Sequence, residues 1–498
     1  MLVIVSDLHL TDGTVSETVS PEAVRRFVGQ LRAMAEAASW RCDGGYRPVE
    51  QVDIVLLGDV LDLLHSSRWT AGGDVRPWDR SHPEELAEQV SRITAELLAH
   101  NEAALSELRA LAAEGGLRVP PGLRAGRPAA TSEEHPVAVR LHYLVGDHDW
   151  FLHVPGASFA EARTLVVRAL GLRGRGEQPF PHEMTDADEL LAAMRRHKVA
   201  ARHGDCFDPL AFEEDRGTAS LTDALVIELA VRFAVEIEQA LAEELPAAAV
   251  AAIRELDHVH PLAMMPAWLE GVLERTCPQP AQRRRLKAVW DGLVEDLLAL
   301  DFVGRAGPGR LPGLADALRR ALAFGHRPRG DWAAANAAWL ADLRGAAAPS
   351  YVSHALAEPD FRNRRARHVV FGHTHQAECL PLEASHAEAF VLSQIYFNAG
   401  TWRRVYRPTQ VTGRAAEFVG AETIGCLAFY QGDERGGRPF ETWSATLGLK
   451  PLDVAVHRID SGKASHASRE PHSSSGHGHA PHFSAGTAAT RRVSARRQ

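Results

Sequence analysis

The chain has 498 residues, of which 45% are hydrophobic and 24% are charged, as in ordinary globular proteins with a large core. Its net charge of −9 gives no support to a general nucleic-acid-binding surface, and no uncharged run of about 18 apolar residues predicts a membrane span. The five cysteines form no CxxC pair, which argues against a cysteine zinc site and is typical of a reducing compartment. Because the opening stretch does not resemble a signal peptide, we expect a cytoplasmic protein. The sequence indicates no particular protein partner.

The first half of the chain alternates between short apolar runs and helical patterns. Continuous Val, Ile and Leu runs predict strands over residues 2–9, 52–62 and 139–149, each covered on both faces. Helices are predicted over 21–38 and 83–116, of which the second begins with Pro-Glu-Glu and stops at two glycines. This alternation of strands and helices predicts an α/β fold.

The second half combines a long helical stretch with further strands. A short strand is predicted at 198–205, and residues from about 219 to 345 are rich in Ala and Leu with a helical pattern. Strands resume over 366–375, 389–402 and 422–430. Since these late strands have no long helices between them, they predict a second sheet. The expected fold is a two-sheet α/β sandwich with a large helical insertion.

Four segments follow from these patterns. Residues 1–218 and 346–459 are predicted to form the two parts of the core, and 219–345 to form a helical insertion that could act as a cap. Residues 460–498 are rich in Ser, Gly, His and Arg and cannot bury enough apolar surface to fold, so we expect a disordered tail. The five histidines of this tail could bind metal weakly.

Aspartate or histidine stands at the end of every conspicuous predicted strand. The residues concerned are Asp7, His9, Asp59, Asp147, His148, His203, His373 and His375. Parallel strands of a doubly wound sheet end at one edge, where ligands bind, so we expect these side chains to meet. Mixed histidine and carboxylate ligands suit Mn²⁺, Fe, Zn²⁺ or Co²⁺ better than Ca²⁺. Two such ions that share a carboxylate are the usual apparatus for displacement at phosphorus.

These strand ends carry five short motifs, "SDLH", "GDVLD", "GDHD", "RHGD" and "GHTH". In this order they resemble the motifs DxH, GDxxD, GNH[DE], a single His and GHxH of the calcineurin-like metallophosphoesterases, over about residues 1–410. The resemblance implies the α/β sandwich of that family and a hydrolase that cleaves a phosphate ester with two divalent ions, of which Mn²⁺ is the first choice. It also implies a small-molecule or nucleotide phosphoester as the substrate, with a diester or pyrophosphate preferred.

The resemblance further implies a role for each residue. The ions would be held by seven side chains: Asp7, His9 and His375 on the first ion, Asp147, His203 and His373 on the second, and Asp59 on both. A hydroxide between the ions would attack phosphorus. His148 would protonate the leaving oxygen as the general acid, and Asp62 would orient the His148 ring.

Asp147 departs from the family pattern, which places Asn at this position. Both side chains present an oxygen, so metal ligation survives, but the aspartate adds one negative charge to the ion cluster. The neighbouring carboxylate, Asp149, is expected to face backbone donors instead of an ion.

Other readings of the same motifs stay open. One is a non-catalytic metal-binding scaffold on the same fold, although the presence of His148 and all seven ligand positions argues against it. Another is a phosphoprotein phosphatase, although no resemblance to those enzymes extends beyond the metal motifs. A nuclease is not favoured by the acidic net charge. The UDP-diacylglucosamine pyrophosphatases share similar motifs but usually carry Arg where this chain has His148.

Two roles are open for each of two polar residues near the motifs. Asp205 could brace His203 or form a turn, and Asn398 could bond within the site or form the turn that follows its strand. The histidines without a spacing partner are expected to be ordinary surface or loop residues: His65, His153 and His326.

Overall fold

A computed structural model describes residues 1–71, 75–131, 133–174, 176–212, 215–260, 264–305, 314–324, 350–387, 390–408 and 418–451. The chain divides into two units, Met1–Ala455 and Val456–Gln498, and everything below concerns the first. The predicted tail, residues 460–498, lies outside the described residues, as does His326.

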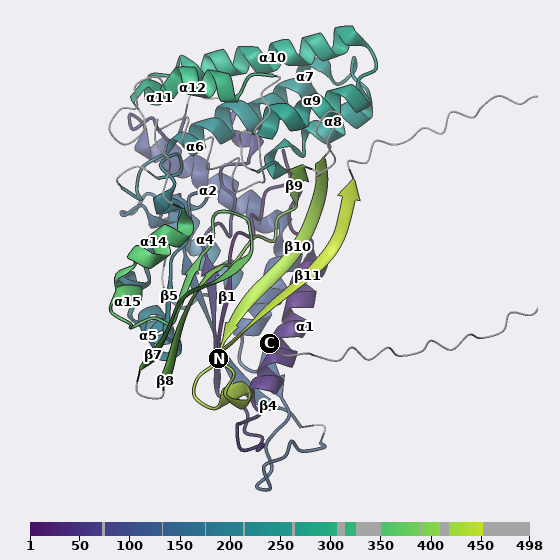
Figure 1. Ribbon diagram of the computed structural model, residues 1–498. Coiled ribbons are helices and arrows are strands. Elements are labelled where there is room, and N and C mark those ends of the chain that lie inside the picture. Colours follow the sequence, from purple (N-terminus) through teal and green to yellow (C-terminus); the bar gives the residue numbers. More distant parts are fainter. Residues whose placement is uncertain are drawn as a thin grey trace, which may run out of the picture. The chain divides into compact units, whose positions relative to one another are not determined.

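The strands form two mixed sheets (Figure 1). Their bounds are β1 (Leu2–Val5), β2 (Gln51–Leu57), β3 (Leu117–Val119), β4 (His135–Leu144), β5 (Val199–Ala201), β6 (His368–Phe371), β7 (Glu378–Ala387), β8 (Phe390–Asn398), β9 (Val405–Pro408), β10 (Phe418–Phe429) and β11 (Phe440–Pro451). The larger sheet has the order β11-β10-β1-β2-β4-β3, with β9 paired to β10. The smaller sheet has the order β5-β6-β8-β7.

Parallel strands lie at the centre of both sheets. In the larger sheet β1, β2 and β4 are parallel, and Val5 pairs with Leu56 while Leu57 pairs with Leu144. These strands therefore end at nearly the same level. In the smaller sheet β5, β6 and β8 are parallel.

Strict alternation in the central strands builds two cores. Leu2 and Ile4 of β1 pack in one buried cluster with Val370 and Phe397 of the smaller sheet, which joins the two sheets face to face. Val3 and Val5 point to the opposite side, into a cluster filled by helices α1 to α4. A strand buried on both faces has this pattern because successive side chains point to opposite faces.

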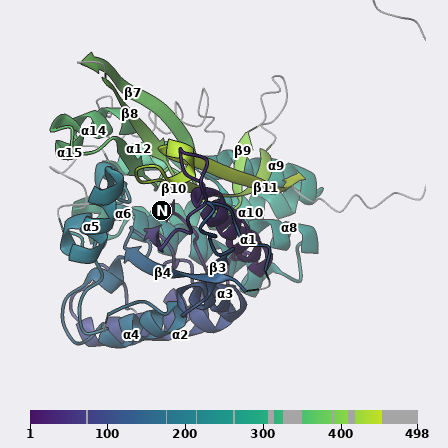
Figure 2. The same ribbon diagram turned by 90° about the horizontal axis from the view of Figure 1, so that it is seen from below.

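Helices cover the outer faces and fill the segment between β5 and β6. Their bounds are α1 (Pro21–Ala38), α2 (Pro83–His100), α3 (Glu102–Ala112), α4 (Ala160–Leu170), α5 (Asp188–His197), α6 (Leu221–Ala224), α7 (Arg232–Leu241), α8 (Ala247–Ile253), α9 (Met265–Thr276), α10 (Pro280–Leu298), α11 (Asp301–Arg305), α12 (Leu314–Ala321), α14 (Tyr351–Ala357) and α15 (Pro359–Arg362). Figure 2 shows α14 and α15 beside β7 and β8, whereas α2 and α4 lie on the side of β4.

The helices from α6 to α12, called the helical region below, have a hydrophobic core of their own. Trp268 and Trp290 are fully buried in it, and Tyr406 of β9 and Phe418 of β10 extend it to the larger sheet. A π-helical segment, η5 (Leu225–Val231), joins α6 to α7. Figure 1 shows these helices at the β9 end of the molecule.

The predicted α/β class is confirmed, and the differences from the expected elements have local causes. The helix expected over 83–116 is split into α2 and α3, because the Asn101 side chain donates hydrogen bonds to the carbonyl groups of Thr11 and Leu97 at the junction. The first three strands end earlier than expected, since turns begin directly after Val5, Leu57 and Leu144. Strands β3, β7, β9 and β11 were not predicted. Parts of the predicted helical insertion, residues 261–263, 306–313 and 325–345, lie outside the described residues.

Candidate metal centre

The candidate ligands lie in the turns that follow the parallel strands. Those turns come directly after β1, β2 and β4 in the larger sheet and after β5 and β6 in the smaller one. The candidate residues are the seven expected ligands together with His148 and Asp62, nine in all. Each of them is at least half-buried, and most are almost fully buried. The fold therefore brings together polar side chains from both sheets at one edge, where ligands bind in folds of this class.

Unusual backbone conformations are concentrated in these turns. Five candidate ligands have a positive φ: Asp7 (53°), His9 (47°), Asp59 (49°), His373 (63°) and His375 (56°). Few residues other than glycine adopt this region, and each such residue costs about 1–3 kcal/mol when it is held there by its surroundings. Strain of this kind is typical of functional sites, where the surrounding structure holds a side chain in place at the expense of a favourable backbone conformation.

Asp7, His9 and His375 form the first cluster, and their ligand atoms lie within 4.8 Å of one another. The Nε2 atoms of His9 and His375 are 2.9 Å apart, and Nε2 of His375 is 3.3 Å from Oδ1 of Asp7. Two nitrogens that bind one ion at about 2.0–2.1 Å, at right angles, would be separated by a similar distance.

Asp59, Asp147, His203 and His373 form the second cluster. Oδ1 of Asp147 is 3.2 Å from Nε2 of His203 and 3.0 Å from Nδ1 of His373. The other nitrogen of His373 is 3.3 Å from Oδ2 of Asp208, a residue that the sequence did not single out. Asp208 thus lies where a hydrogen-bond partner would orient the ring of a metal-binding histidine.

Asp59 lies between the two clusters. Its Oδ2 atom is 3.5 Å from Nε2 of His9 and 3.2 Å from Nε2 of His203. One carboxylate oxygen therefore faces a histidine nitrogen of each cluster, as a ligand shared by two ions would.

Outer hydrogen bonds fix which nitrogens are available to a cation. Nδ1 of His9 donates to Asp62 at 3.0 Å, and Nδ1 of His203 donates to the Leu57 carbonyl at 2.9 Å. When either ring is neutral, it presents the lone pair of its Nε2 to carboxylates or to another imidazole. Lone pairs and carboxylates that face each other in a buried site repel unless a cation lies between them. The chemistry of this donor set therefore fits divalent metal ions.

The electrostatics agree with a site for positive charge. Burial opposes protonation of His203, but the carboxylates of Asp59 and Asp7 outweigh burial and raise the pKa of His203 well above its usual value. Burial likewise opposes the ionised form of Asp147, yet His373 and His203 hold its pKa well below its usual range. The carboxylates that would hold a metal cation thus also favour a proton.

Close approach explains the glycines that precede the ligands. A Cβ atom on Gly58 would lie 2.4 Å from Nδ1 of His203, and one on Gly146 would lie 2.3 Å from Oδ1 of Asp59. Neither position has room for a side chain while the ligands stay in place.

His148 lies beside the clusters and is bonded to Asp62. Its Nδ1 donates to Oδ1 of Asp62 at 2.8 Å, and its Nε2 is 4.0 Å from Oδ2 of Asp147. Burial alone would lower the pKa of His148, but Asp62 and Asp59 outweigh it and raise the pKa to about 10. A charged imidazole in this position can donate a proton to a group that binds at the clusters.

His65 is not the ordinary surface or loop histidine that was expected. It is 4% exposed, and its Nδ1 donates to Oδ2 of Asp62 at 2.8 Å. The only sequence signal for this role is its position three residues after Asp62, in the turn that follows β2. Asp62 thus orients three histidines, His9, His65 and His148.

Two further residues connect the site to the helical region. Arg403 pairs with Asp62 at 3.3 Å and also forms a buried ion pair with Asp257. The ring of His260 packs against that of His375 with centroids 4.1 Å apart, and its Nε2 is buried without a hydrogen-bond partner among the described residues. No motif recognised in the sequence included Arg403, Asp257 or His260.

Asp205 does not brace His203, whose Nδ1 is bonded to a backbone carbonyl instead. It forms a buried ion pair with Arg216 at the start of a short 3₁₀ helix, η4 (Asp205–Phe207). Asn398 combines both roles considered for it, since its amide donates to the Gly372 carbonyl at 2.7 Å and its oxygen accepts from the Gly400 backbone.

Asp149 faces backbone donors, as expected. The N–H groups of Val60 and Gly146 donate to it at 3.0 and 2.6 Å, and the Tyr143 hydroxyl donates at 2.6 Å. Burial and the nearby Asp59 raise the pKa of Asp149 to about 7. Asp149 therefore ties the turn after β2 to the turn after β4.

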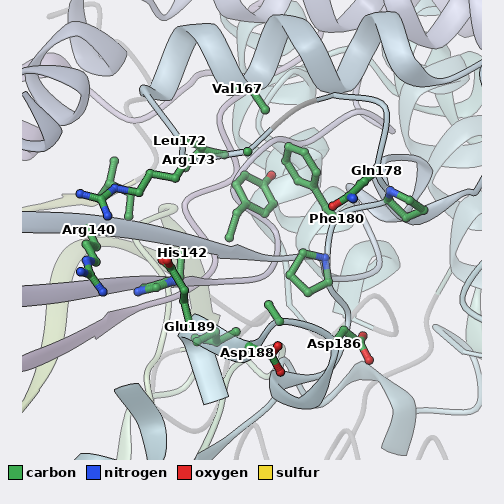
Figure 3. Close-up of a pocket in the computed structure, with 17 residues that line it drawn as sticks. Arg140, His142, Val167, Leu172, Arg173, Gln178, Phe180, Asp186, Asp188 and Glu189 are labelled. Carbon is green, nitrogen blue, oxygen red and sulfur yellow. The ribbon is translucent and has the colours of Figure 1, made fainter. Parts of the chain in front are cut away.

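A hollow of about 400 Å³ lies beside residues 140–143 of β4, beyond the part of that strand that pairs with β3 (Figure 3). Arg140 and Arg173 line one part of it and Asp186 and Asp188 another, and Phe180 also lines it. None of the nine candidate site residues lines this hollow.

The chain matches no model of a known protein family and no curated protein sequence. Among the described residues, no helix has both the length and the apolar character needed to cross a bilayer.

Proposed function

We propose that the protein is a phosphoesterase of the metallophosphoesterase type, which hydrolyses a phosphate diester or pyrophosphate with two divalent ions. The observation that carries this proposal is the position of Asp59 between two His/Asp clusters, with one oxygen facing a histidine nitrogen of each. The two-sheet fold and the order of the five motifs support it.

The residues present fit a pair of ions. Asp7, His9 and His375 would hold one, Asp147, His203 and His373 would hold the other, and Asp59 would contact both. Mn²⁺ is the first choice, and Fe, Zn²⁺ or Co²⁺ also suit these ligands. Such ions, when bound, supply Lewis acidity that polarises the phosphoryl group and makes water nucleophilic near neutral pH.

His148 supplies the proton that the leaving group needs. As a bond from water to phosphorus forms and the bond to the leaving oxygen breaks, the proton on Nε2 of His148 passes to that oxygen. Asp62 holds the ring by its Nδ1 and stabilises its charged form, since it is itself ionised. Burial opposes this ionisation, but His148 and His65 hold the pKa of Asp62 well below its usual range.

Metal-dependent turnover tests the proposal. Protein stripped of metal with a chelator should be inactive on bis-p-nitrophenyl phosphate and should regain activity when Mn²⁺ is added. The reactivated protein should contain about two ions per chain, as measured by inductively coupled plasma mass spectrometry. Asp59→Asn should lose both metal and activity. Asp53→Asn is the matched control, because Asp53 is equally buried but pairs with His142 and Arg196 away from the clusters.

The alternatives predict different outcomes of the same experiment. A non-catalytic scaffold would bind metal through Asp59 without any turnover. A phosphoprotein phosphatase would act on phosphopeptides and p-nitrophenyl phosphate better than on the diester.

A further inference from the structure

His65 and His148 form a matched pair on one carboxylate. Their Nδ1 atoms donate to different oxygens of Asp62, each at 2.8 Å. The two rings are stacked with centroids 5.6 Å apart and planes only 9° from parallel. Both rings therefore turn their Nε2 atoms away from Asp62, side by side.

The two histidines differ in their distance from the metal clusters. His148 has ligand atoms within 4.8 Å of those of His9 and Asp59, whereas His65 is grouped in this way only with Asp62 and His148. The order from the clusters outward is thus His148 and then His65. A substrate whose phosphate lies at the clusters and whose leaving oxygen meets His148 would extend toward His65.

Nε2 of His65 can accept a hydrogen bond from a bound molecule. The Nδ1 proton is committed to Asp62, so the neutral ring offers only a lone pair at Nε2. Within the described part of the chain, this atom has no hydrogen-bond partner. Burial lowers the pKa of His65 to about 4, which keeps the ring neutral near pH 7. This atom is not among the buried polar atoms that lack a partner, so water can reach it, and a substrate hydroxyl could take the place of that water.

We propose that His65 is a specificity residue that accepts a hydrogen bond from a hydroxyl group next to the ester oxygen of the leaving alcohol. The inference rests on the proposed function and deepens it. The substrate class is then a phosphoester of a polyol or sugar, and esters of simple alcohols or phenols are poorer substrates. A site built to bond a substrate hydroxyl discriminates against the analogue that lacks it.

The test compares two symmetrical diesters, diglyceryl phosphate and dipropyl phosphate, whose leaving alcohols differ in the neighbouring hydroxyl. The wild-type protein with Mn²⁺ should favour the glyceryl ester in kcat/KM by about 3- to 10-fold, the value of one ordinary hydrogen bond. In His65→Phe, which keeps a stacking ring, this ratio should fall to about 1. His65→Gln, which can still donate to Asp62, should lose the preference too.

The ratio of kcat/KM for the glyceryl and propyl esters shows whether His65 recognises the substrate hydroxyl or has only a structural role. If His65 acted only by holding Asp62 and His148 in place, both substitutions would slow the two esters equally and leave the ratio unchanged. His153→Phe is the control, because His153 bonds the Phe180 carbonyl outside the clusters, and its ratio should match the wild type.

Each outcome decides between the two proposals. Equal rates on both esters in the wild type, or a preference that survives both His65 substitutions, would overturn the role of His65 alone, provided that bis-p-nitrophenyl phosphate is hydrolysed. A wild-type protein that hydrolyses none of the three esters would overturn the proposed function and the role of His65 together.

Discussion

Asp62 of the candidate site and Asp257 of the helical region are joined by a single guanidinium, that of Arg403. All three side chains are at least 95% buried. Burial lowers the pKa of Arg403, although Asp62 and Asp59 favour its charge, so the group is held there by its carboxylate partners. The helical region is thus linked by charge to the residue that orients His9, His65 and His148.

Removal of Asp257 should therefore destabilise the protein strongly. In Asp257→Ala, Arg403 loses one partner in a buried environment, and breaking such a pair typically costs about 3–5 kcal/mol. Urea unfolding should show this loss in the free energy of unfolding. The exposed pair of Arg285 and Glu244, within the helical region, is the control, and Glu244→Ala should cost about 0–1 kcal/mol. Equal costs for the two variants would contradict a special role for Asp257.

Replacing His148 with Ala should lower turnover by about 10²–10⁴-fold, the usual contribution of a general acid. Metal content should stay at the wild-type level, because His148 is not a candidate ligand. The loss should shrink for esters with activated leaving groups, which need little protonation. Rates across a series of leaving-group pKa values would check this, and a loss of the same size on every ester would argue against the acid role.

Asp147→Asn should make the ion cluster more cationic by one charge. We expect weaker metal retention, a gain in monoester over diester activity, and a pH–rate profile moved toward acid, because a stronger Lewis acid lowers the pKa of bound water. Metal dialysis and matched substrates assayed across pH would measure these effects. If the substrate ratio and the pH profile both stay unchanged, Asp147 contributes only an oxygen atom.

The stability of the protein should depend on pH through His368. This residue is 3% exposed among the rings of Phe397, Phe429 and Phe440, and burial lowers its pKa to about 3. His368 takes up a proton at about pH 6.5 in the unfolded chain but only at about pH 3 in the folded chain. The stability that depends on a neutral His368 is therefore fully present above pH 6.5. It is lost as the pH falls toward 3, by up to about 1.4 kcal/mol per pH unit.

Thermal or urea unfolding between pH 7 and pH 4 should therefore show a shallower slope for His368→Phe than for the wild type. His82→Phe is the control, because the His82 side chain is 60% exposed, and it should leave the slope as it is. An unchanged slope in His368→Phe would show that its burial does not couple to protonation.

The sequence predicted the α/β class and named the residues that meet at the strand ends, because glycine, aspartate and histidine interrupt apolar runs at regular places. It did not predict Asp208 or Arg403, since each gains its role from a partner brought close only by folding. His65 was missed although Asp62 is only three residues away, because that spacing alone does not show that the two side chains turn toward each other. The expected strands were too long because periodicity does not reveal the positive φ angles of Asp7 and Asp59. Edge strands such as β11 were missed because exposed polar residues interrupt their apolar pattern.

The first cluster joins His9 and His375, which are 366 positions apart. An ion held by both would act as a crosslink that closes most of the polypeptide into a loop, and its binding energy would add to the stability of the whole fold. During synthesis on the ribosome, the first cluster could not be completed before β6 and the turn after it had emerged. Metal loading would then be a late step of maturation, and a chain truncated before "GHTH" would lack one ligand of each cluster.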